Sequence, residues 1–158
     1  MKVVRTSQVE WAAGMKQGAF EGRRKPLGEG KLGCSLWELP PGKRSFPLHS
    51  HHITEEALYV VSGSAKVRTP SGETAIGPGD FVSFPAGGEA HQLVNDGTAA
   101  LIYLGMSATL GVDIVEYPDS GKIACSVGAY PQAKRFIFRA QEQVPYFDGE
   151  KDAEPGAK

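Results

Sequence analysis

The chain is poor in the residues and patterns that mark several large classes of protein. It has only two cysteines, Cys34 and Cys125, which lie far apart without CxxC spacing, so neither a disulfide scaffold nor a thiolate metal site is indicated. No apolar run is long enough for a signal peptide or a membrane-spanning helix. The 17 basic and 18 acidic residues nearly balance, which argues against binding to nucleic acid or an anionic membrane. We therefore expect a cytoplasmic protein whose partner is a small molecule.

Long helical periodicity is also missing. No stretch keeps apolar residues at helical spacing for more than about two turns, and 20 glycines and 11 prolines divide the sequence into short apolar segments. Turn sequences recur about every ten residues, which is typical of β-sandwiches and barrels. The sequence therefore predicts an all-β fold. The predicted strands are Leu32–Leu39, Arg44–His51, Ala57–Val61, Ala65–Thr69, Glu73–Ile76, Phe81–Phe84, His91–Asn95, Ala100–Leu104 and Val112–Tyr117.

The two ends of the chain fit the strand pattern less well. Residues 1–30 predict an N-terminal arm, which is either irregular or an added edge strand. Residues 31–147 predict one β-barrel domain with a C-terminal extension, in which Phe136–Phe138 indicates one further strand. Residues 148–158 are rich in charge, glycine and proline, and they predict a flexible tail.

All four histidines lie in two short segments, HSHHITEE and PAGGEAHQLVN. Side chains alternate faces along a strand, so His49 and His51 are expected on one side, about 6.6 Å apart. Two imidazoles placed in this way can chelate one metal ion. His52 is out of phase with them and is expected to face away.

An acidic pair follows the first histidine segment. Glu56 begins an apolar run, so it can return to the same cavity from the adjacent strand. If Glu56, Leu58 and Val60 face inward, strand alternation directs Glu55 to the other side. Glu56 is therefore the candidate ligand, and Glu55 is a candidate surface residue.

The fourth histidine, His91, opens a strand of its own after a Pro-Gly corner. His91, Leu93 and Asn95 are expected to share one face, so His91 can supply a further ligand from across a barrel. We expect Leu93 to form part of a dry wall beside the ion. Tyr59 and Tyr103 are expected to be packing residues on the barrel exterior.

The two histidine segments resemble the two sequence motifs of the cupin superfamily. GKRSFPLHSHHITEEALYVVSG, residues 42–63, is similar to the first motif, and GDFVSFPAGGEAHQLVN, residues 79–95, is similar to the second. Two spacings are one residue longer than usual, before His49 and before His91, and neither change removes a ligand. The resemblance implies a small single-domain cupin protein with one cupin-type jelly-roll barrel. It also implies His49, His51, Glu56 and His91 as the metal ligands.

Three imidazoles and one carboxylate suit one divalent transition metal, namely Fe, Mn, Ni, Co or Zn. Such a site leaves coordination positions open for substrate oxygens, water or dioxygen, and its ion can polarise a carbonyl. In the resembling family these positions serve dioxygenases, oxidases and sugar isomerases. We therefore expect a metal-dependent enzyme of one of these types, which coordinates a small oxygenated molecule directly.

Two other interpretations stay open. One is a non-catalytic module that binds or senses a metal or a small ligand. The other is a barrel without metal, because some members of the family bind ligands in that way. The family resemblance also favours a homodimer. The apolar segments Trp11–Phe20 and Phe136–Phe138 and an exposed strand edge support that expectation.

Overall fold

The computed structural model describes residues 1–128 and 132–151, and nearly all of its regular structure is β-strand. Two short 3₁₀ helices, η1 (Thr6–Gln8) and η2 (Pro118–Ser120), are the helical elements of this part. Within it, no helix is long and apolar enough to cross a lipid bilayer. Positions 152–158 of the tail that we predict to be flexible lie outside the described residues. The strands are β1 (Lys16–Gln17), β2 (Phe20–Glu21), β3 (Arg23–Gly28), β4 (Leu32–Leu39), β5 (Ser50–His51), β6 (Glu55–Ser62), β7 (Ala65–Thr69), β8 (Gly72–Ile76), β9 (Phe81–Phe84), β10 (Gln92–Val94), β11 (Leu101–Ala108), β12 (Val112–Tyr117), β13 (Lys122–Val127) and β14 (Lys134–Arg139).

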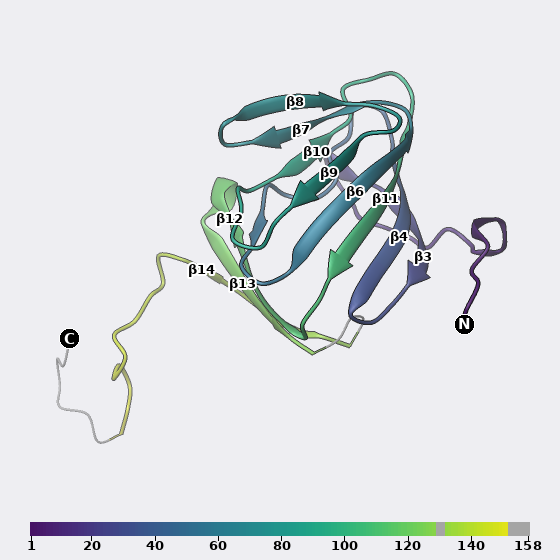
Figure 1. The fold of residues 1–158 in the computed structure, drawn as a ribbon. Coiled ribbons are helices and arrows are strands. Elements are labelled where there is room, and N and C mark those ends of the chain that lie inside the picture. Colours follow the sequence, from purple (N-terminus) through teal and green to yellow (C-terminus); the bar gives the residue numbers. More distant parts are fainter. Residues whose placement is uncertain (129–131, 152–158) are drawn as a thin grey trace.

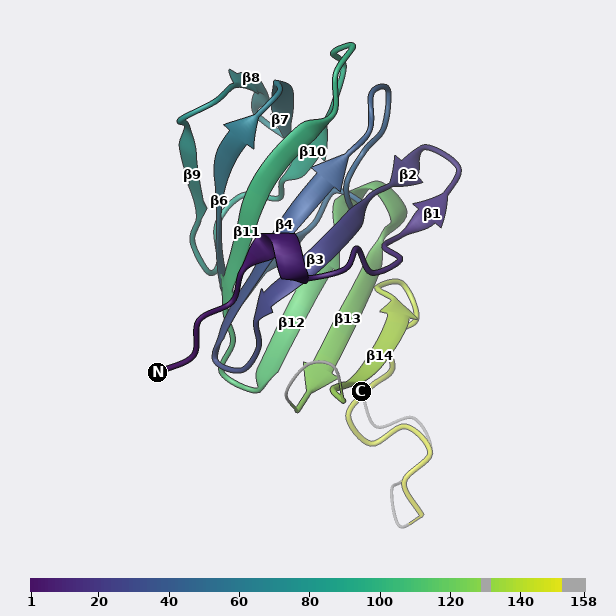
Figure 2. The same cartoon turned by 90° about the vertical axis from the view of Figure 1, so that its right-hand side faces the viewer.

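Two larger antiparallel sheets face each other across the barrel (Figures 1 and 2). The five-stranded sheet has the order β3-β4-β11-β6-β9, and the four-stranded sheet has the order β14-β13-β12-β5. A three-stranded sheet, β10-β7-β8, lies at the top of Figure 1, and β1 and β2 form a small hairpin. This is a jelly-roll arrangement. The predicted all-β barrel with an N-terminal arm and an additional C-terminal strand is confirmed.

Strand alternation places the apolar core between the sheets. Along β6, Leu58 and Val60 are buried whereas Tyr59 and Val61 are exposed, as period-two alternation requires. Glu56 shares the inward face, and Glu55 is on the exposed one. The core consists of Leu39, Leu58, Val60, Ala65, Val67, Ile76, Leu93, Leu101 and Tyr103.

Gly63 follows directly after β6 and has a backbone conformation that other residues rarely adopt. Its φ angle is +79°, and a Cβ atom built there would lie 2.3 Å from the carbonyl oxygen of Ala100. Both the left-handed backbone and the close approach of the neighbouring chain require glycine. The glycine of the first motif thus fixes the turn that follows the strand carrying Glu56.

The predicted strand Arg44–His51 is wrong over most of its length, because only Ser50–His51 is a strand. Pro47 lies inside the predicted segment, and proline cannot donate to a ladder. The segment pairs with the chain around β10 only through isolated bridges, one from Arg44 to Val94 and one from His49 to His91.

The ends of the chain supply more strands than the pattern predicts. In the N-terminal region, β3 pairs with β4 as an edge strand of the five-stranded sheet, which is the second of the two alternatives for residues 1–30. In the C-terminal region, β14 extends over Lys134–Arg139 around the predicted segment, and β13 was not predicted at all. Together they form the side of the four-stranded sheet that lies beyond β12.

The expectation that Tyr103 lies on the barrel exterior is wrong. Tyr103 pairs with Trp37 on one side and Val60 on the other, and it belongs to the buried core. Its ring stacks on Trp37 with centroids 6.4 Å apart, and burial raises the pKa of its hydroxyl. Tyr59, by contrast, is exposed as expected.

Candidate metal centre

His51 lies in β5 and His49 directly before it, and their ring centroids are 5.0 Å apart. The Nδ1–H of His49 donates a hydrogen bond of 2.8 Å to the carbonyl oxygen of Pro47. The Nδ1–H of His51 donates to a carboxylate oxygen of Asp113. In the neutral imidazoles these bonds hold the proton on Nδ1, so both Nε2 atoms carry a free lone pair.

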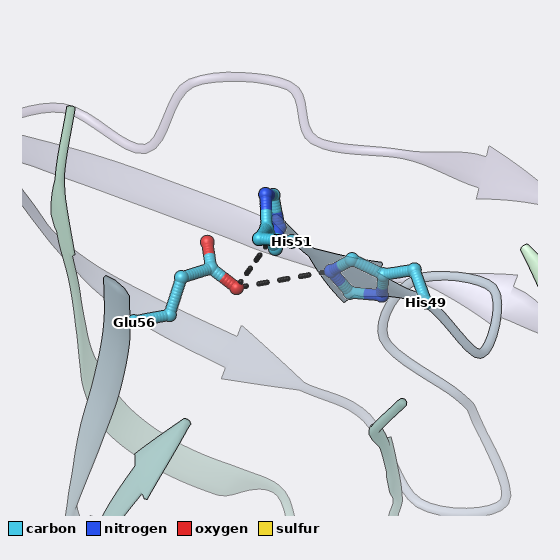
Figure 3. Close-up of side chains that lie close together, drawn as sticks. All are labelled: His49, His51 and Glu56. Carbon is cyan, nitrogen blue, oxygen red and sulfur yellow. Dashed lines mark ion pairs between the residues drawn. The ribbon is translucent and has the colours of Figure 1, made fainter. Parts of the chain in front are cut away.

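Glu56 brings one carboxylate oxygen to the point where the imidazoles meet. Its Oε2 lies 3.7 Å from Nε2 of His49 and 3.3 Å from Nε2 of His51, as the dashed lines in Figure 3 show. The same oxygen lies 3.4 Å from Nε2 of His91. The structure therefore brings all four predicted residues to one place, although His91 comes from a segment far from the other three in the sequence.

His91 is held against His49 by the backbone. The two residues exchange N–H···O bonds of 2.8 and 3.2 Å, and their rings lie 4.7 Å apart. The His91 ring also stacks on Phe84, with centroids 3.7 Å apart and an angle of 9° between the planes. Its Nδ1 is buried and has no hydrogen-bond partner among the described residues. The ring is thus fixed by packing, and its Nε2 is the atom directed toward Glu56.

The electrostatics of the metal-free cluster are those of a buried charge network. Burial raises the pKa of Glu56, but the three imidazoles overcome this effect and hold it well below its usual value. Burial lowers the pKa of His51, but Glu56 and Asp113 together raise it to about 9. Burial and the neighbouring His49 keep the pKa of His91 below its usual value. An ionised carboxylate therefore faces one imidazolium before any metal binds.

Asp113 is the residue of this site that the sequence did not reveal. It is buried, and its Oδ1 accepts hydrogen bonds from the amides of Ile53 and Thr54 at 3.2 and 3.3 Å. Its other oxygen accepts the bond from His51. A carboxylate that accepts the Nδ1–H of a ligand histidine fixes the tautomer and orientation of that ring. The available signal was an acidic residue amid the apolar residues of Val112–Tyr117.

Two residues near the motifs point away from the cluster, as strand alternation predicts. His52 is 47% exposed at its side chain, and its Nε2 lies 2.8 Å from Glu116. Glu55 is also exposed. Asn95 is buried and binds the backbone of Leu39 and Gly97, so it shapes the turn.

The donor atoms of the cluster fit a transition metal. Ligand atoms of His49, His51 and Glu56 lie within 4.8 Å of one another, and this group could hold a metal ion. The Nε2 atom of His91 approaches the same carboxylate oxygen. Imidazole and carboxylate without thiolate is a donor set for divalent first-row metals. Assignment of all four residues as ligands stays a prediction.

Comparison with known protein families finds a match over part of the chain. The family model of the cupin domain matches residues 35–106, which include all four candidate ligands but not Asp113. No curated protein matches the chain.

Several solved structures share the fold. A protein of Acidithiobacillus ferrooxidans, provisionally named a sugar phosphate isomerase, is 27% identical, with a TM-score of 0.72 over 90% of this chain and 95% of the other. A sugar phosphate isomerase from a cupin superfamily, of Silicibacter pomeroyi, is 22% identical, with a TM-score of 0.77 over 93% and 98%. A predicted oxalate decarboxylase of Thermotoga maritima is 26% identical, with a TM-score of 0.59 over 69% and 100%.

Proposed function

We propose that this chain, which belongs to the cupin superfamily through its domain at residues 35–106, is a metal-dependent isomerase of a small phosphorylated sugar. The observation that carries the proposal is the convergence of three imidazole Nε2 atoms on one carboxylate oxygen, at 3.3 to 3.7 Å. The choice of isomerisation is supported by the similarity to the Acidithiobacillus ferrooxidans protein, which extends over 90% of this chain. The Silicibacter pomeroyi structure supports the fold alone.

His49, His51 and His91 would hold the metal through Nε2, and Glu56 would hold it through Oε2. When bound, the ion would supply Lewis acidity that polarises a substrate carbonyl. Backbone and carboxylate partners fix the rings of His49 and His51 before substrate arrives, so little reorganisation is needed. The imidazole contacts of Glu56 all go to Oε2, so we assign Oε1 the role of accepting and returning the proton that moves between neighbouring sugar carbons.

On the β11 side of Glu56 the wall is built from small side chains, whereas Phe84 of β9 pairs with Glu56 on the other side. Antiparallel partners share a sheet face, so Ser107, which pairs with Glu56, and Gly105, which pairs with Leu58, are on the inward face. Gly33 and Ser35 continue these rows on β4. Leu58 lies behind Glu56 in the apolar core, where it keeps water away from the base of the site. The indole of Trp37 lies over Gly105, so Ser107 and Gly33 are the small residues that would leave room beside the carboxylate for a substrate of a few carbon atoms.

Purified protein tests the proposal directly. We expect elemental analysis to find one divalent transition metal per chain. We also expect aldose–ketose interconversion of a phosphorylated sugar, followed by NMR, that stops after chelation and returns with added metal. Metal without turnover across aldose and ketose phosphates would instead favour a binding module. Oxygen consumption, or release of CO2 from a dicarboxylate, would contradict the isomerase proposal and indicate another metal-dependent reaction.

We also propose that the chain forms a homodimer through the outer face of its four-stranded sheet. Ile114, Cys125 and Phe136 lie in one row across three strands, and Ile123 and Phe138 lie in another. Phe136 and Phe138 are about half exposed, at 52% and 49%. An apolar face of this kind is self-complementary when two copies meet about a two-fold axis.

Light scattering after gel filtration checks this assignment. Phe136→Lys is expected to convert a dimer into a monomer at micromolar concentration, because it places a charge in the apolar face. Ile137→Lys is the matched control, since Ile137 is 54% exposed on the same strand but occupies the opposite face. A monomeric wild-type protein would contradict the proposal.

A further inference from the structure

The sheet face that carries Asp113 continues onto β13 and β14, where it carries three cations. His51 pairs with Val115, so alternation along β12 places Asp113, Val115 and Tyr117 on the face that meets the histidines. The strands β12, β13 and β14 lie side by side (Figure 2), and their register continues the rows of this face across the sheet. Its rows are Asp113–Ser126–Arg135, Val115–Ala124–Ile137 and Tyr117–Lys122–Arg139.

These cations lie close to the candidate metal centre. The ring of Tyr117 stacks on that of His49 with centroids 6.2 Å apart, and Nζ of Lys122 lies 5.4 Å from the Tyr117 centroid. Arg135 lies in the same row of the sheet as Asp113, whose carboxylate binds His51. Tyr117 thus joins the histidine cluster to Lys122, which pairs with Arg139 on β14.

The cations of this face are not held by carboxylates of the described residues. Five basic side chains do have carboxylate partners, as Arg23 has Glu38 at 2.8 Å. In residues 1–128 and 132–151, no ion pair joins Lys122, Arg135 or Arg139 to a carboxylate. Moreover, Lys122 stands directly opposite Arg139 in the ladder. Like charges in this position repel each other, and a bound anion would relieve the repulsion.

We propose that Arg135, Lys122 and Arg139 bind the phosphate group of the substrate while its carbonyl end occupies the histidine cluster. This inference rests on the proposed function, and it assigns a binding site to the phosphate end of the same substrate. Adjacent strands are about 4.8 Å apart, so β14 lies about 10 Å from β12. A sugar phosphate of a few carbon atoms can span the remaining gap, because long basic side chains reach toward it. Arginine offers paired donors that match phosphate oxygens.

The test compares Arg135→Gln with Lys134→Gln, its neighbour on the opposite face of β14. For a phosphorylated substrate of the metal-loaded enzyme, Arg135→Gln is expected to raise KM by about tenfold or more with little change in kcat. Lys134→Gln is expected to leave both constants unchanged. In parallel, metal-free protein labelled with ¹⁵N is titrated with glycerol 3-phosphate and with glycerol. Amide shifts are expected at Ser126 and Arg135 with the phosphate ester only.

The outcomes separate this inference from the proposed function. If no isomerase activity exists but glycerol 3-phosphate still shifts these amides in wild type and not in Arg135→Gln, the phosphate site stands and the isomerase proposal fails. If the enzyme isomerises sugars but Arg135→Gln behaves like Lys134→Gln, the phosphate site is wrong. Absence of ester-specific shifts at millimolar concentrations would also overturn it.

Discussion

Replacement of His51 by alanine is expected to abolish stable metal binding, whereas the same replacement at the neighbouring His52 leaves metal content unchanged. The Nε2 atom of His51 lies 3.3 Å from Glu56, while His52 is out of phase and pairs with Glu116 at the surface. Loss of an outer-shell partner alone typically lowers metal affinity about 10–100-fold, so loss of a direct ligand should exceed that range. Competition with a chromophoric chelator measures both variants.

The paired alanine variants make this result decisive. Each removes one imidazole from adjacent positions, so a general effect of losing histidine would appear in both. Circular dichroism of the metal-free forms checks that the barrel persists. Equal affinities for the two variants would show that the ligand assignment is wrong. A third variant, His91→Ala, then decides whether the set contains three ligands or four, because the Nε2 atom of His91 is 3.4 Å from the same oxygen of Glu56.

Local sequence pattern and turn sequences predicted most of the strands. The predicted bounds of β4, β7, β9 and β12 agree with the structure. The pattern failed at Arg44–His51, where a proline and isolated bridges replace a regular ladder. It also failed for β13, whose sequence KIACSV has no clear alternation. Which strands become neighbours depends on contacts between distant segments, and single-strand patterns do not encode them.

The candidate site was predictable in the part that two short motifs encode. Strand alternation separates His51 from His52 and Glu56 from Glu55, and the structure has the same separation. The role of Asp113 was not predicted, because Asp113 lies 62 residues beyond His51 in the sequence. Alternation along β12 was ambiguous as well. Apolar side chains occupy both faces, since Ile114 is exposed and Val115 is buried. Only the pairing of β12 with β5 shows which face meets the histidines.

The second large effect is expected from Asp113→Asn. The pairing of β12 with β5 places Asp113 beside His51. One oxygen of Asp113 accepts the amides of Ile53 and Thr54, and the other accepts the Nδ1–H of His51. If the asparagine oxygen keeps the two amides, its NH2 group must face Nδ1 of His51. A donor at that position forces the imidazole proton onto Nε2, which is the atom needed for the metal. The metal affinity should therefore fall by about 10–100-fold or more.

The matched control is Glu116→Gln, which alters a second carboxylate–histidine pair on the same strand. That pair is exposed and joins Glu116 to His52, so its loss should leave the metal affinity unchanged. Equal affinities for both variants would contradict the role of Asp113.

Stability of the metal-free protein gives an independent measurement of the same contact. The pKa of His51 is raised to about 9 in the folded state, against about 6.5 in an unfolded chain. Its contribution to the free energy of unfolding is therefore fully present below pH about 6.5 and is lost as pH rises through about 9. Asp113→Asn removes one of the two anions that raise this pKa. Urea unfolding of the variant should consequently show a weaker decrease in stability over that pH range than wild type, because Glu56 alone then holds the imidazolium.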